Sequence, residues 1–150
     1  MNPFECIFVN DYQGLVTYLE NGNVNVTDDR GKTLLDYAIQ FHNNDIFELL
    51  IKSYINVNIK DNLGNTAIHY AVINNKLGYL KTLLQIPNVD PKVVNNTGHS
   101  PLYLACLYGR LEIVKLFLET HNIDLTIGIQ KDFLTFNVLK KLENPNNNIL

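Results

Sequence analysis

Cysteine is scarce in this sequence. The two cysteines, Cys6 and Cys106, lie a hundred residues apart and form no CxxC pair. Zinc sites in proteins use closely spaced cysteine and histidine ligands, and the four histidines do not supply that spacing either. We therefore expect no metal site and no cofactor. A disulfide is not expected in a reducing cytosol.

Basic charge is also in short supply. Twelve lysines and arginines stand against fifteen aspartates and glutamates, and the formal net charge is -3. The basic residues are scattered, and Lys140 and Lys141 form the only adjacent pair. Proteins that bind nucleic acid usually present a concentrated basic face. We therefore expect no nucleic acid among the partners.

Long apolar runs are missing as well. No run approaches the roughly 20 residues that a membrane-spanning helix needs. The first five residues lack the basic region and the long apolar stretch of a signal peptide. We therefore expect a cytoplasmic protein without a membrane partner. The composition of the whole sequence, 46% hydrophobic and 18% charged residues, is typical of a globular protein.

A repeat with a period of 33 to 34 residues runs through this globular sequence. Gly31, Gly64 and Gly98 each stand two residues before a residue with a hydroxyl group. Each of these segments is followed, after a short break, by an amphipathic run. The hydroxyl residues are Thr33, Thr66 and Ser100, and the amphipathic runs are 46–51, 80–84 and 113–118.

The residues of each repeat predict a pair of short helices. Thr33, Thr66 and Ser100 can each cap a helix by accepting backbone N–H bonds, and Pro101 is favourable just inside a helix start. Because the apolar residues lie on one face only, no pair can bury its face alone. The pairs must therefore stack into a helical solenoid. Small residues at Ala38, Ala71 and Ala105 leave room for close approach between helices.

These segments resemble the ankyrin repeat, in its G-x-T-P-L-H-x-A-A opening and its I-V-x-L-L-L second helix. The resemblance implies an all-α ankyrin-repeat solenoid of stacked helix-turn-helix units with β-hairpin-like loops. We interpret the 150 residues as a single domain. It would comprise an N-terminal cap unit (1–27), three full repeats (28–60, 61–94 and 95–128), a degenerate C-terminal cap (129–143) and a frayed tail (144–150).

The chain departs from the family pattern at its turns. Ankyrin repeats usually place glycine between the two helices, where a positive φ is needed. This chain has Gly109 in one repeat but Asn10, His42 and Asn75 in the others, and Asn and His tolerate that region. After the second helix, Pro87 stands where the family prefers glycine. Since proline cannot adopt a positive φ, we expect the loop at Pro87 to follow another path.

Catalytic interpretations find little support in the residues. His69 occupies the histidine position of the family's T-P-L-H motif, where the ring braces neighbouring loops by hydrogen bonds. Asp36 and Tyr103 fill that position in the other repeats. The glycines form neither a GxxxxGK[ST] phosphate loop nor a GxGxxG motif. We therefore predict that the chain is not an enzyme and has no catalytic residues.

The resemblance implies that a partner protein binds a concave face, made by the hairpin tips and the exposed ends of the first helices. Several apolar side chains would form a stripe there, which a solvent-facing surface does not carry without a reason. The predicted function is therefore protein binding by a monomer. The predicted partner-binding residues are Arg30, Lys32, Leu63, Asn96 and His99 at the tips, and Phe41, Ile73, Asn74, Leu107 and Tyr108 at the helix ends.

Two alternatives stay open at this point. The same stripe could join copies of the chain in a homo-oligomeric assembly. A small-molecule-binding protein or an enzyme with a site between units is the other alternative. That site needs convergent polar residues in a pocket, and the sequence offers no set of them that we can name.

Overall fold

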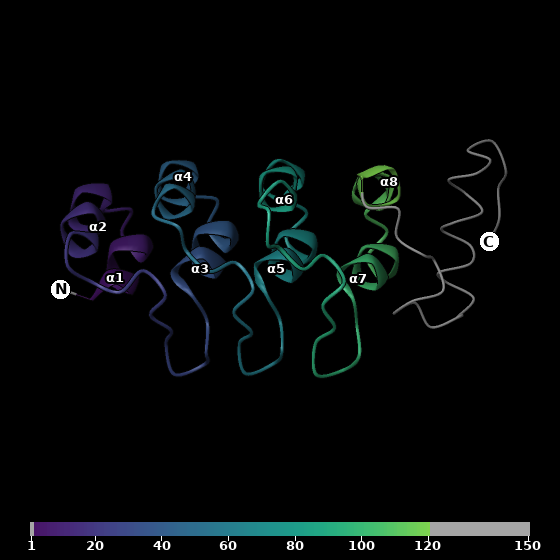
Figure 1. Ribbon diagram of the computed structural model, residues 1–150, viewed down its shortest axis with the longest axis horizontal. Coiled ribbons are helices and arrows are strands. Elements are labelled where there is room, and N and C mark those ends of the chain that lie inside the picture. The colour runs from purple at the N-terminus through teal and green to yellow at the C-terminus, as the bar shows by residue number, and fades with distance from the viewer. Residues whose placement is uncertain (1, 121–150) are drawn as a thin grey trace, which may run out of the picture.

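Eight helices arranged in four pairs make up the described part of the chain (Figure 1). The structure is a computed structural model that describes residues 2–120. The predicted C-terminal cap (129–143), the tail (144–150) and the last residues of the third repeat lie outside the described residues. The helices are α1 (Pro3–Phe8), α2 (Tyr12–Leu19), α3 (Leu34–Gln40), α4 (Asn44–Lys52), α5 (Ala67–Ile73), α6 (Leu77–Leu84), α7 (Pro101–Leu107) and α8 (Leu111–Thr120).

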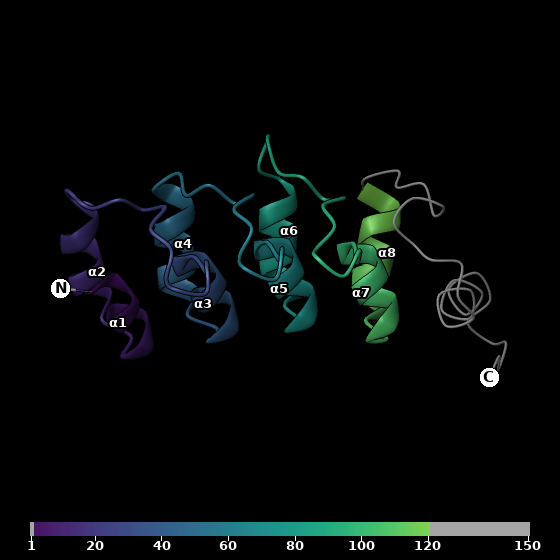
Figure 2. The same ribbon diagram turned by 90° about the horizontal axis from the view of Figure 1, so that it is seen from below.

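The four pairs stack side by side in chain order, as both views show (Figures 1 and 2). The first helices of the pairs, α1, α3, α5 and α7, each contact the next one in the row. Three long loops project together from this row, each entering one of α3, α5 and α7. The all-α ankyrin-type solenoid predicted from the sequence is confirmed. Between residues 2 and 120, the only β pairing is an isolated bridge between Thr27 and Thr33.

The helix starts are capped at the predicted hydroxyl residues. Thr33 accepts a hydrogen bond from the backbone N–H of Asp36 at 3.1 Å, and Ser100 accepts one from Tyr103 at 3.0 Å. Thr66 is also an N-cap, but there the backbone N–H of Thr66 donates to Nδ1 of His69 at 3.1 Å. These side chains satisfy backbone groups that a helix leaves unpaired at its first turn.

The core lies between the helix pairs and runs the length of the row. Ala38, Ala71 and Ala105 are fully buried, as expected for positions where helices approach closely. Larger side chains from the second helices fill the remaining space, including Phe47 and Phe117. Both cysteines are buried within this core. Each pair therefore buries its apolar face against its neighbours, as a solenoid requires.

The turns inside the pairs adopt the left-handed conformation expected from the sequence. Asn10, His42, Asn75 and Gly109 have φ values of 56°, 58°, 55° and 67°. Asparagine and histidine therefore replace glycine at these turns without changing the path of the backbone.

None of the helices within residues 2–120 combines the length and the apolar character that crossing a membrane requires.

The ends of the second helices differ from one another. Tyr54, which follows α4, has a φ of 60° and is 90% exposed. Gly22 at the corresponding place after α2 lies outside the left-handed region, and a Cβ there would come within 2.5 Å of the Tyr18 ring. Glycine is therefore required at Gly22 for space, whereas Tyr54 adopts a conformation that favours glycine.

Candidate functional site

The three projecting loops share one internal design. In the first loop, Asp28 accepts hydrogen bonds from the backbone N–H groups of Arg30 and Lys32 at 3.0 and 2.9 Å. Asp61 and Asn95 accept the corresponding pairs of bonds in the second and third loops. We call residues 28–32, 61–65 and 95–99 the first, second and third hairpin loops. Their tips are held in similar shapes by one side chain each.

Asparagines join each hairpin loop to the one before it. The backbone N–H of Asn62 donates to the Arg30 carbonyl at 2.9 Å, and its Nδ2 donates to the Asp29 carbonyl at 3.1 Å. Asn96 repeats both bonds one repeat later, to the carbonyls of Leu63 and Asn62. We call this series the asparagine ladder. It fixes the spacing of the loop tips, and it uses the amide of the predicted binding residue Asn96 internally.

The predicted brace at His69 is present. The Thr66 N–H donates to Nδ1, so Nε2 carries the proton and donates to the His99 carbonyl at 3.1 Å. Burial lowers the pKa of His69 below its usual value, which keeps the ring neutral. The ring of His99 stacks on Tyr103 at 4.4 Å. His99, a predicted binding residue, is therefore half-buried and takes part in the scaffold.

Three aromatic rings meet at the ends of α1 and α3. The ring of Phe41 stacks on Tyr37 at 6.2 Å and meets Phe8 edge-on at 5.6 Å. Phe8 also meets Tyr37 edge-on at 5.2 Å. Phe8 and Phe41 are 53% and 49% exposed, so the cluster presents a large apolar surface to solvent. We call these three residues the aromatic cluster.

Lys32, another predicted binding residue, is held between two tyrosines. Its Nζ lies 4.4 Å from the ring centre of Tyr37 and 4.6 Å from that of Tyr70, and it donates to Oε1 of Gln40 at 2.9 Å. Contacts of this kind attract the ammonium group to the ring face. The Lys32 ammonium group thus links the first hairpin loop to α3 and α5.

The two tyrosines are themselves fixed by aspartates. The Tyr37 hydroxyl donates to Asp28, and the Tyr70 hydroxyl donates to Asp61. Burial and then the bond to Asp28 raise the pKa of Tyr37 to about 12. Burial alone would raise the pKa of Asp28, but bonds from Tyr37, Lys32 and Arg30 hold it below its usual value. The aromatic cluster therefore rests on a polar framework in which Asp28 is ionised.

The remaining predicted binding residues divide into exposed and half-buried groups. Leu63, at the tip of the second loop, is 64% exposed, and Leu107 and Tyr108 are exposed at the end of α7. Ile73 is half-buried against the core, and Asn74 donates to the Tyr70 carbonyl at 2.8 Å. Arg30 is exposed at the first tip. The apolar stripe is thus most exposed at the aromatic cluster, at Leu63 and at the end of α7.

The equivalent of His69 in the first repeat, Asp36, has an unusual environment. It is 1% exposed, and its Oδ2 accepts the Thr33 N–H at 3.1 Å. Its Oδ1 is buried and has no hydrogen-bond partner. Burial is the main reason that the pKa of Asp36 is raised to about 7, and the charge of Asp61 adds to it. A buried acceptor without a donor is costly when the group is ionised.

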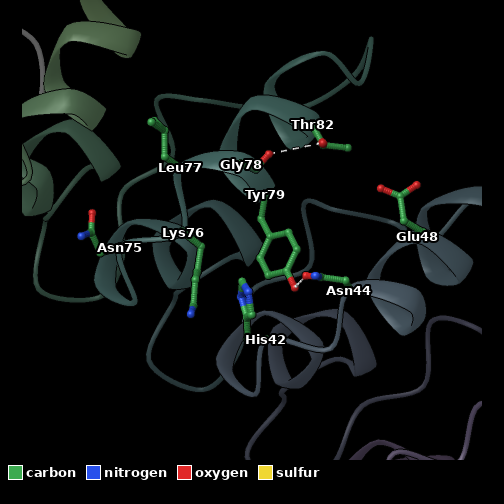
Figure 3. A pocket seen from close by; sticks show the side chains of 9 residues that line it. All are labelled: His42, Asn44, Glu48, Asn75, Lys76, Leu77, Gly78, Tyr79 and Thr82. Carbon is green, nitrogen blue, oxygen red and sulfur yellow. Dashed lines mark hydrogen bonds between the residues drawn. The ribbon is translucent and has the colours of Figure 1, made fainter.

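A cleft of about 560 Å³ lies between the turns of α3–α4 and α5–α6 (Figure 3). On its floor, the Tyr79 hydroxyl donates to Oδ1 of Asn44, and the His42 ring tilts against the Tyr79 ring at 5.2 Å. Burial and the charge of Glu48 raise the pKa of Tyr79, so its hydroxyl is not activated as a base or nucleophile. The lining residues are His42, Asn44, Glu48, Asn75, Lys76, Leu77, Gly78, Tyr79 and Thr82.

This cleft does not assemble a recognisable reaction centre. In Figure 3 the Glu48 carboxylate and the Lys76 ammonium group point away from each other, and neither reaches the Tyr79 hydroxyl. Between residues 2 and 120, no three His, Cys, Asp or Glu side chains come together in a way that could hold a metal ion. The arrangement therefore offers no pairing of nucleophile and base from which to argue a reaction.

Phe8 and Tyr37 were missed as site residues by the sequence analysis, although the sequence contains a signal for both. Phe8 lies two residues before the turn residue Asn10, as Gln40 lies two residues before His42, so it holds a helix-end position in the N-terminal cap unit. The pairs Asp28–Tyr37 and Asp61–Tyr70 are 33 residues apart. Extending the repeat alignment into the first unit would have placed Phe8 among the helix-end residues.

Comparisons with known proteins agree with this architecture. The family model "Ankyrin repeats (3 copies)" matches residues 55–129, and the model "Ankyrin repeat" matches residues 30–62. A search of curated proteins found no match.

Proposed function

Because the chain belongs to the ankyrin-repeat family, we propose that it is a non-catalytic module that binds a partner protein through the concave face. Ankyrin repeats generally mediate interactions between proteins. We define the concave face here as the tips of the three hairpin loops and the C-terminal ends of α1, α3, α5 and α7. The proposed setting is the cytoplasm.

The aromatic cluster is the observation that carries this proposal. Phe8 and Phe41 leave about half of their surface in solvent, yet their rings are held in fixed edge-on and stacked contacts with Tyr37. Rigid aromatic side chains of this kind bury a large area at a small entropic cost. Exposed apolar patches on otherwise well-packed proteins mark interaction sites. The cluster is therefore the proposed anchor of the interface.

The surroundings of the anchor indicate the chemistry of the partner. Leu63 adds an exposed apolar side chain from the second loop, and Arg30 adds one exposed cation. Because Lys32 is engaged with Tyr37, Tyr70 and Gln40, it contributes little free charge to the face. We therefore propose a partner that inserts apolar side chains between the aromatic cluster and the loop tips.

The proposal is tested by removing the anchor. Phe8→Ser combined with Phe41→Ser should reduce recovery of the co-purifying partner at least tenfold, because the exposed apolar area is lost. Tyr54→Ser is the matched control: Tyr54 is a more exposed aromatic residue, after α4 rather than on the concave face. Thermal unfolding establishes that all variants are folded. Equal recovery by the double variant and the wild type would rule out the cluster as the anchor.

Self-association through the same residues is the competing function, and the exposure of the cluster is the observation that favours it. Light scattering at micromolar concentration separates the two. We expect a monomer. A dimer that the Phe8→Ser and Phe41→Ser changes dissociate would replace the proposed partner with a second copy of the chain.

A further inference from the structure

We propose that Asp36 is a proton-operated brace between the first and second hairpin loops. In its neutral form the side chain donates a hydrogen bond toward the second loop, as His69 does toward the third. In its ionised form that connection is missing. This inference concerns the scaffold alone and does not depend on partner binding.

His69 provides the template for the brace. Its ring uses one nitrogen to accept the Thr66 N–H and the other to donate to the His99 carbonyl, which belongs to the next hairpin loop. The same carbonyl also accepts the Asn95 N–H at 3.0 Å. A carbonyl oxygen has two lone pairs, so it can serve both donors at once.

Asp36 reproduces half of this arrangement. Its Oδ2 accepts the Thr33 N–H at 3.1 Å, as Nδ1 of His69 accepts the Thr66 N–H. The counterpart of the His99 carbonyl is that of Asn65, which already accepts the Asp61 N–H at 2.9 Å. Only the second bond of the template is absent, and the Asp36 Oδ1 that would make it is buried without a partner. A carboxylate cannot donate a hydrogen bond, whereas a carboxylic acid can.

Two aspartates lie near each other here, and they differ in how fully hydrogen-bond donors satisfy them. Asp61 accepts bonds from the N–H groups of Leu63 and Asn65 and from the Tyr70 hydroxyl, so its carboxyl oxygens are well supplied with donors. Asp36 has a partner on one oxygen only. Two neighbouring carboxylates do not both ionise easily. Asp36 is therefore the carboxyl here that gains a hydrogen bond by taking up a proton.

The other charged groups around Asp36 do not offset this arrangement. From the first hairpin loop, Lys32 favours ionisation, but its ammonium group is shared with Gln40 and two tyrosine rings. From the second loop, Asp61 opposes ionisation. α5 presents the neutral His69 and Tyr70, and the Asp36 charge raises the pKa of Tyr70 further. α1 adds the buried thiol of Cys6 and the exposed Glu5, and α4 carries only exposed charges, at Asp45, Glu48 and Lys52.

The sign of the pH effect follows from the direction of the shift. The pKa of Asp36 rises on folding from an ordinary value of 3.8 to about 7. Between these values the folded chain holds a proton that the unfolded chain has released. The stabilisation is therefore complete below about pH 4 and is lost as the pH rises toward 7. For one proton, the unfolding equilibrium constant increases by up to about tenfold per pH unit in this window.

The test compares urea unfolding of the full chain from pH 5 to pH 8 in the wild type, Asp36→Asn and Asp29→Asn. Asparagine copies the neutral acid, since its oxygen can accept the Thr33 N–H and its amide can donate. We expect the ratio of wild-type to Asp36→Asn unfolding constants to rise at least tenfold across this range. Asp29 is exposed in the same loop, and Asp29→Asn should follow the wild type. Equal pH dependence in the wild type and Asp36→Asn would overturn the proposal.

Hydrogen exchange locates the effect. After correction for intrinsic exchange, the protection factors of the amides in the second hairpin loop should fall between pH 5 and pH 8. This fall should be at least tenfold larger than the fall in the third loop, which the His69 brace holds. An equal change in both loops contradicts the brace. If Asp36→Asn does not fold, the carboxyl carbon of Asp36 in the wild type is titrated by NMR. A midpoint at or above pH 6 supports the proposal, and a lower one overturns it.

Discussion

At the scale of single residues, Tyr54 is the place where the chain carries an avoidable strain. A side chain with a Cβ in the left-handed region costs about 1–2 kcal/mol, and Tyr54 has a φ of 60°. With 90% of its surface in solvent, the ring has little packing to offset this cost. We predict that Tyr54→Gly raises the free energy of unfolding by about 0.5–1 kcal/mol, after the extra flexibility of glycine in the unfolded chain is subtracted.

Urea denaturation measures this change, with Tyr54→Ala as the control. Alanine removes the same ring but keeps the Cβ, so we expect its stability to remain close to that of the wild type. A loss of stability in Tyr54→Gly would show that the ring makes a contribution that its exposure does not suggest.

The left-handed residues also show what sequence reasoning could and could not reach at this scale. His42 and Asn75 were predictable because they stand at a fixed offset in the repeat and belong to residue types that tolerate a positive φ. The brace at His69 was predictable from its place in the motif. The buried Oδ1 of Asp36 without a hydrogen-bond partner was not predictable. A sequence shows which residue replaces histidine at this position, but not whether its neighbours can donate hydrogen bonds to it.

At the scale of elements, the hairpin loops depend on how closely successive tips approach. Gly64 has a φ of 78°, and a Cβ there would lie 2.5 Å from Oδ1 and 2.7 Å from the backbone nitrogen of Asn96. Gly98 has a φ of 80°, but a Cβ there would meet nothing within 4 Å among the described residues. The two glycines therefore share the same backbone requirement, and among the described residues only Gly64 comes close to another loop.

This pair separates the cost of conformation from the cost of contact. We predict that Gly98→Ala lowers the free energy of unfolding by about 1 kcal/mol through conformation alone. Gly64→Ala should lower it by about 3 kcal/mol, because it also pushes apart the asparagine ladder. Chemical denaturation of both variants checks the difference. Equal losses would mean that the second and third loops do not approach as closely as described.

The elements themselves were largely predictable, whereas most of the links between them, the His69 brace excepted, were not. Hydroxyl caps and apolar spacing located the helices, since both are local properties of the sequence. The asparagine ladder depends on backbone carbonyls of a neighbouring loop, which no sequence pattern displays. The three-ring aromatic cluster depends on α1 and α3 lying side by side, and its Phe8 was missed although the repeat pattern places it at a helix end.

At the scale of the whole molecule, each described helix pair packs against its immediate neighbours in the row. In such arrays the cooperativity of unfolding depends on the interfaces between repeats. The His69 brace crosses the interface between the second and third repeats. His69→Ala removes this bond, unpairs the Thr66 N–H and leaves a cavity, so we predict a loss of about 3 kcal/mol. The unfolding transition should also become broader. In it, α7 of the third repeat should lose hydrogen-exchange protection before α3 of the first repeat.

The matched control is His99→Ala, which removes the other histidine near this interface but keeps the carbonyl that accepts the brace. It should retain a single sharp transition. If His69→Ala also unfolds in one sharp step with uniform loss of protection, the brace does not couple the two repeats.

Because the pKa of His69 is lowered on folding, its stabilising contribution should be present above about pH 6.5 and decline as the pH falls below it.

The asparagine ladder carries an implication for how such a chain changes length over generations. The second hairpin loop donates to the loop before it through Asn62 and accepts from the loop after it at Leu63 and Asn62. It holds both halves of the connection, so a tandem duplication of residues 61–94 would create two loops that fit each other without any new mutation. A duplicated repeat thus carries its own ladder hydrogen bonds. Gene duplication can lengthen the row by whole repeats while preserving the bonds that set the spacing of the loop tips.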